Sequence, residues 1–128
     1  MSSIIYNYHI LCQDVKNLDK KIRFAGVINE RGRLVASEMK KNGQMVSEKD
    51  EEMWFMELAL RVKMRRDFED QLGKVKYSMT IREEHVGMNF PIKTDFLYVA
   101  TDPDVNLIEL PLKIIKTINS QEKNQKMR

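Results

Sequence analysis

The chain has 128 residues and a net charge of +3; 42% of its residues are hydrophobic and 32% are charged, as in one ordinary globular domain. Its apolar runs are too short to span a bilayer, and its first residues lack the basic start and sustained apolar stretch of an export signal. We therefore expect a single cytoplasmic domain over residues 1–120 and a flexible polar tail over residues 121–128, with no membrane insertion.

The first predicted element is a helix over residues 4–18. Its apolar positions recur at spacings of three and four, the period of one helix face, and they are Ile4, Tyr8, Leu11, Val15 and Leu18.

A hairpin follows over residues 22–37, where two β-rich runs flank the polar segment 29–32. Because this segment closes on Gly32, which tolerates a positive φ, we expect a tight turn there.

A long second helix is predicted over residues 48–72. Ser47 can cap its first backbone N–H groups, acidic residues occupy its first turn, and Gly73 is a natural stop. The expected inner stripe consists of Met53, Met56, Leu60, Met64, Phe68 and Leu72. Other apolar residues, Trp54, Phe55, Leu58 and Val62, lie on other sides of its first half. Such a helix is either wedged deeply into its own domain or part of a subunit interface, and the pattern leaves both interpretations open.

Three strands and a final helix complete the predicted order. Residues 75–81 alternate between apolar and polar, which predicts a strand with one buried face, and a further strand is expected over residues 86–92. The nearly continuous apolar run 96–100 predicts a central strand. Because Pro111 has no N–H group, regular helix should begin at Ile108 or later. The buried face of this helix is formed either by Leu112, Ile115 and Ile118 or by Leu110 and Ile114.

Two segments resemble a known family. Residues 26–37, Gly-Val-Ile-Asn-Glu-Arg-Gly-Arg-Leu-Val-Ala-Ser, are similar to the first hairpin of the roadblock / dynein light chain family, of the archaeal or bacterial type. Residues 97–107, Leu-Tyr-Val-Ala-Thr-Asp-Pro-Asp-Val-Asn-Leu, resemble the final strand of that family and its Asp-Pro-x-x-Asn-Leu entry into the last helix. The resemblance also includes the predicted order of elements.

This resemblance implies an α+β, profilin-like fold, a three-layer α/β/α sandwich with elements in the order α-β-β-α-β-β-β-α. Its five-stranded antiparallel sheet would have the order 2-1-5-4-3, with the second helix on one face and the terminal helices on the other. The resemblance further implies a non-catalytic protein that forms a homodimer and docks or regulates a small Ras-like GTPase or a related signalling partner. The alternative is a sensor domain of the PAS or profilin type that encloses a small molecule.

Two groups of residues are candidates for contacts with other molecules. We predict a self-association surface made of apolar residues from the second helix and the strand after it, namely Met53, Trp54, Phe55, Met56, Tyr77 and Met79. A basic ridge of Arg61, Arg65 and Arg66 could meet an acidic partner, or it could be ion-paired with Asp67, Glu69 and Asp70. Because the body of the chain is nearly neutral and no aromatic residues interleave with the ridge, we expect no nucleic-acid binding.

No catalytic, cofactor-binding or metal-binding residues are predicted. The five glycines are scattered singly, so the chain lacks a phosphate-binding loop. His9 and His85 lie on different predicted elements, and helix capping accounts for Asp102 and Asp104. Cys12 is the only cysteine, which excludes an intramolecular disulfide, and we expect it to be a small buried side chain.

Overall fold

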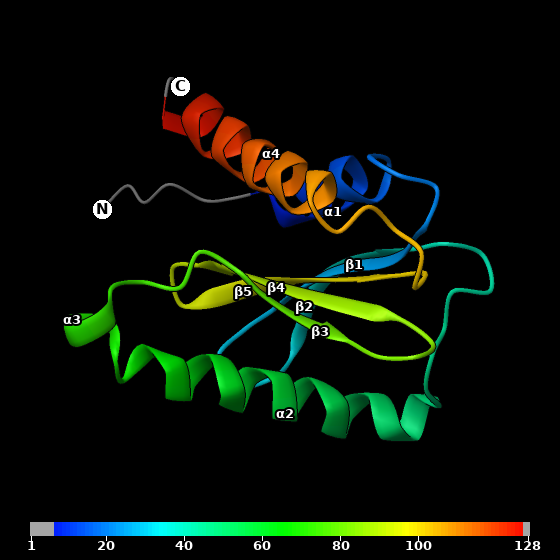
Figure 1. Ribbon diagram of the computed structural model, residues 1–128, viewed down its shortest axis with the longest axis horizontal. Coiled ribbons are helices and arrows are strands. Elements are labelled where there is room, and N and C mark those ends of the chain that lie inside the picture. The colour runs from blue at the N-terminus through cyan, green and yellow to red at the C-terminus, as the bar shows by residue number, and fades with distance from the viewer. Residues whose placement is uncertain (1–6, 127–128) are drawn as a thin grey trace.

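The computed structural model describes residues 7–126, which form a sheet between two layers of helices (Figure 1). In chain order the elements are α1 (Tyr8–Lys16), β1 (Ile22–Ile28), β2 (Leu34–Met39), α2 (Glu48–Arg66), α3 (Glu69–Leu72), β3 (Ser78–Ile81), β4 (Val86–Ile92), β5 (Asp95–Thr101) and α4 (Glu109–Lys126). This confirms the predicted fold class and element order, to which the structure adds the single-turn helix α3. The predicted first helix begins at Tyr8, and Ile4 lies outside the described residues.

The five strands form one antiparallel sheet in the order β2-β1-β5-β4-β3, as predicted. β5 lies between β1 and β4, and six of its seven residues are buried, which explains its nearly continuous apolar sequence. β3 is a short edge strand that covers only the second half of the predicted segment 75–81. Figure 1 shows α1 and α4 on one face of the sheet and α2 on the other.

Each face of the sheet has its own apolar core. The core under α1 and α4 includes Leu11, Cys12, Val27, Val99, Leu110, Ile114 and Ile118, so the second of the two faces predicted for the last helix is the main buried one. Leu112 is exposed instead. The side chain of Asn106 accepts hydrogen bonds from the N–H groups of Ile108 and Glu109, which fixes the start of α4 at the predicted place. α4 then continues to Lys126, beyond the predicted domain end at residue 120.

The β1–β2 hairpin contacts α2. Gly32 has a φ of +80°, as predicted, and the side chain of Asn29 accepts hydrogen bonds from the N–H groups of Arg31 and Arg33 within the turn. A Cβ atom at Gly32 would lie 2.8 Å from the Cα atom of Met56. The turn therefore needs glycine for its backbone conformation and also for its close approach to α2.

The second helix differs from its prediction in two respects. It ends at Arg66, and a break at residues 67–68 separates it from α3, so the predicted continuous helix over residues 48–72 is wrong at its C-terminal end. Its buried side chains are Phe55, Leu58, Ala59 and Val62, which pack with Phe24, Ile28, Phe96 and Tyr98. The predicted inner stripe is therefore wrong, because it lies on the outer side of the helix.

Candidate interaction surface and cleft

The outward side of α2 carries a row of large apolar side chains. We call Met53, Met56, Leu60 and Met64 the α2 stripe; each of them is between 56% and 75% exposed. Phe68 and Leu72, which follow α2 in the chain, are also exposed. Large exposed apolar surfaces are uncommon on monomeric soluble proteins, so the α2 stripe is a candidate contact with another molecule.

The six residues of the predicted self-association surface do not all lie together. Met53 and Met56 belong to the α2 stripe. Phe55 is 4% exposed and stacks on Phe24 with ring centroids 6.0 Å apart, so it belongs to the monomer core, which corrects its predicted place in an interface. Trp54, in the first half of α2, is half-buried.

The two predicted strand residues lie toward the other side of the sheet. Tyr77 stacks on Phe90 with ring centroids 5.6 Å apart, and Met79 packs against the core under α1 and α4. Their side chains are thus separated from the α2 stripe by the sheet. Within the described residues β3 pairs with β4 alone. The backbone N–H and C=O groups on the other edge of β3 are therefore unpaired in the sheet.

The three arginines of the predicted basic ridge have separate partners. Arg61 forms an exposed ion pair with Glu57, at 3.4 Å. The Nη1 atom of Arg65 donates to the Ser78 hydroxyl, and the Nη2 atom of Arg66 donates to the Lys93 carbonyl, both at 2.8 Å. These two contacts join the end of α2 to the edge strand β3 and to the turn between β4 and β5, so both side chains have partners within the domain. Residues 7–126 show no ion pair between the ridge and the predicted carboxylates, Asp67, Glu69 and Asp70.

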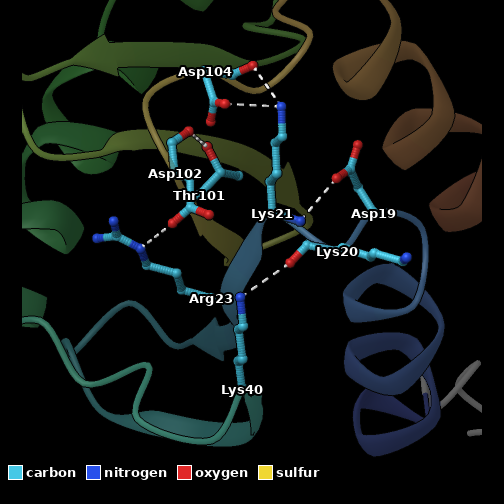
Figure 2. Close-up of polar contacts among 8 residues, drawn as sticks. All are labelled: Asp19, Lys20, Lys21, Arg23, Lys40, Thr101, Asp102 and Asp104. Atoms are coloured by element: carbon cyan, nitrogen blue, oxygen red, sulfur yellow. Dashed lines mark hydrogen bonds and ion pairs between the residues drawn. The ribbon is translucent and has the colours of Figure 1, made fainter.

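A cleft of about 1100 Å³ opens between the loop 42–46, the first half of α2 and the turn 82–85 that joins β3 to β4. Trp54 and His85 form part of its wall, and their rings meet edge to face with centroids 5.8 Å apart. Arg23 also lines the cleft. Figure 2 shows its side chain pointing toward Asp102, whose Oδ1 atom accepts a hydrogen bond from the Nε atom of Arg23. Sequence reasoning missed this cleft, because its lining comes from four separate segments.

His85 is expected to titrate below its ordinary value. Burial lowers the pKa of His85 from 6.5, and the positive charges of Arg82 and Arg23 lower it further. Because the pKa is lower in the folded state than in the unfolded one, the unfolded chain binds more protons below pH 6.5. The free energy of unfolding should accordingly decrease as the pH falls below 6.5 toward the lower pKa of the folded state. Above pH 6.5 His85 is neutral in both states, so the stability lost at low pH is fully present there.

The fluorescence of Trp54, the single tryptophan, measures this titration directly, because its ring touches His85 and an imidazolium quenches indole emission. We expect a midpoint below 6.5 that disappears in His85→Gln and persists in the control His9→Gln. A midpoint at or above 6.5 in the wild type would contradict the burial of His85.

The other candidate chemical groups are inert or scattered. Cys12 is buried as predicted, and burial raises the pKa of its thiol to about 12, so the thiolate is scarcely formed at neutral pH. Within residues 7–126, no three His, Cys, Asp or Glu side chains are grouped as metal ligands would be. In the same part of the chain, no helix has both the length and the apolar character needed to cross a bilayer.

Comparison with known proteins places the chain in a family. The sequence model described as "Family of unknown function (DUF6659)" matches residues 1–125. The chain belongs to this family. No curated protein matches it significantly in sequence.

Several solved structures have the same fold as this chain. MglB from Myxococcus xanthus is 13% identical with a TM-score of 0.73, covering 94% of this chain and 96% of its own. A Roadblock/LC7 domain from Streptomyces avermitilis is 8% identical with a TM-score of 0.70, covering 91% of this chain and 95% of its own. Schizosaccharomyces pombe profilin is 11% identical with a TM-score of 0.58, covering 92% and 95%. The predicted roadblock fold is confirmed, and at such low identities the likeness shows the fold alone.

Proposed function

We propose that this chain is a non-catalytic interaction protein that forms a homodimer through the α2 stripe and the unpaired edge of β3. The observation that carries the proposal is the row of four large apolar side chains on the outside of α2, each more than half exposed. A second copy would remove this surface from water, and burial of apolar area is the main driving force of protein association. The unpaired backbone groups of β3 would also gain partners.

The dimer would dock or regulate a small Ras-like GTPase or a related signalling protein. This part of the proposal comes from the resemblance of the hairpin 26–37 and the segment 97–107 to the roadblock / dynein light chain family, together with the shared fold. Capture of partners from the source cell by the wild type and by a monomeric variant, followed by mass spectrometry, tests it. We expect the wild type to capture a small GTPase or signalling protein and the monomeric variant not to capture it. Equal capture by both would show that partner binding does not require the dimer.

Leu60→Glu is expected to convert the dimer into a folded monomer. Leu60 is 57% exposed, so the glutamate is solvated in a free monomer, whereas a charge left unpaired in a desolvated contact costs several kcal/mol. Analytical ultracentrifugation would measure the mass, and circular dichroism would establish that the variant is folded.

The matched control for this experiment is Leu112→Glu. Leu112 is 59% exposed on α4, across the sheet from α2, so its replacement makes the same chemical change outside the proposed interface. It should leave the dimer intact. A wild type that is monomeric at high micromolar concentration, or dissociation by both substitutions alike, would refute the α2 interface.

A further inference from the structure

The cleft beside α2 combines an apolar surface with an acidic rim. Its apolar lining includes Met45, Met53 and Trp54, of which Met53 is 75% exposed and Trp54 is half-buried. Methionine side chains adapt their shape to different partners, and a tryptophan offers a large rigid contact area. The lining is therefore suited to an apolar side chain from another molecule.

Carboxylates stand on both sides of the opening. Asp50 and Glu57 come from α2, and Glu83 and Glu84 come from the turn between β3 and β4. Asp50 already accepts a hydrogen bond from the Ser47 hydroxyl, and Glu57 is paired with Arg61. In the part of the chain that the structure describes, Glu83 and Glu84 have no ion-pair partner.

The positive charges of the lining do not cancel this acidity. Two guanidinium groups, those of Arg23 and Arg82, stand against the four carboxylates. Arg23 is neutralised by Asp102, outside the lining (Figure 2), and Glu57 likewise by Arg61, so three carboxylates remain against Arg82 alone. His85 adds no full charge at neutral pH, because burial and the two arginines favour its neutral form. The cleft is thus locally acidic on a chain whose net charge is +3, so its sign is not that of the protein as a whole.

We propose that this cleft binds a basic, amphipathic segment of a partner protein, with lysine or arginine side chains at Glu83 and Glu84 and an apolar side chain against Met53 and Trp54. Charge complementarity selects the basic partner, and the apolar lining supplies the contact area. The cleft is open, has a volume of about 1100 Å³ and is lined by four segments of the chain, so an extended segment of another protein could lie along it. This inference goes beyond dimerisation. Met53 belongs both to the α2 stripe and to the cleft, but Leu60 lies outside the cleft, so the two contacts can be tested separately.

The single tryptophan gives the test a direct signal. The probe is an end-capped peptide of alternating lysine and leucine residues, and the control probe is its counterpart of alternating glutamate and leucine. We expect the lysine peptide to shift the emission of Trp54 in a saturable way and to bind more weakly as the salt concentration rises, because exposed charge pairs are screened. The glutamate peptide should produce no saturable shift.

Variants separate the acidic rim from general electrostatics. Glu83→Gln combined with Glu84→Gln should weaken binding of the lysine peptide about threefold to tenfold, the loss expected for two exposed ion pairs. Asp67→Asn combined with Asp70→Asn changes the net charge equally at the other end of α2 and should leave binding unchanged. Met53→Ser, made in the Leu60→Glu background so that no dimer contributes, should weaken binding through the apolar contact. All variants should remain folded, because every replaced side chain is exposed.

Several outcomes would overturn the proposal. These are no response to the lysine peptide, equal responses to both peptides, or equal losses in the two double variants. A change in Trp54 emission with protein concentration alone would show that a second copy occupies the cleft. Added mass on the purified protein in a native mass spectrum, with the peptide unable to bind, would favour the small-molecule sensor instead. Because Leu60→Glu lies outside the cleft, loss of the dimer in that variant with peptide binding retained distinguishes this inference from the proposed function.

Discussion

Phe55→Ala is expected to lower the free energy of unfolding by about 3–5 kcal/mol, the usual cost of removing a phenylalanine from a core. Phe55 is 4% exposed, and its ring lies between those of Phe24 and Trp54, with centroids 6.0 and 5.9 Å away. Its removal therefore leaves a cavity between α2 and the sheet. Urea unfolding monitored by circular dichroism measures the change.

Met64→Ala provides the comparison on the same helix. Met64 is 57% exposed, and an exposed substitution to a good helix former changes stability by no more than about 0.5 kcal/mol. Both substitutions should be made in the Leu60→Glu background, so that loss of a dimer does not contribute. Equal effects at the two positions would place Phe55 on the surface and reverse the orientation of α2.

Gly32→Ala should destabilise the protein by about 2–5 kcal/mol. A side chain at a φ of +80° costs about 1–2 kcal/mol, and forcing an extra atom into a packed contact costs about 1–3 kcal/mol. The second contribution arises because the new Cβ atom would lie 2.8 Å from the Cα atom of Met56, and the backbone of a helix cannot turn aside as a flexible side chain can. Thermal and urea unfolding both measure the loss.

Gly73→Ala isolates the backbone contribution. Gly73 has a φ of +85° and a ψ of 170°, a region that is essentially restricted to glycine, yet no atom lies within 4 Å of its would-be Cβ. We expect it to cost only its strain, about 1–3 kcal/mol. Because the two glycines have similar positive φ values, +80° and +85°, a larger loss at Gly32 would measure the contact with α2. A smaller loss at Gly32 would show that the hairpin moves away from the helix.

Local patterns in the sequence were enough to locate most elements. The β-rich runs around Gly32 predicted the hairpin, the apolar run 96–100 predicted the central strand, and Pro111 limited the start of the last helix. Each signal acts over a few neighbouring residues through backbone conformation, capping or the alternation of faces. The spatial order of the strands came from the resemblance to a family, because nothing local in a strand names its neighbours.

The orientation of α2 depended on the tertiary structure. Apolar residues lie all round its first half, so Phe55 and Met56 were both candidates for the core, and only the shape of the sheet beneath the helix selects Phe55. The functions of Arg65 and Arg66 likewise depend on Ser78 and Lys93, which are distant in sequence. The cleft is assembled from four segments of the chain. Periodicity records how apolar a side of a helix is, whereas burial depends on what the rest of the chain places against that side.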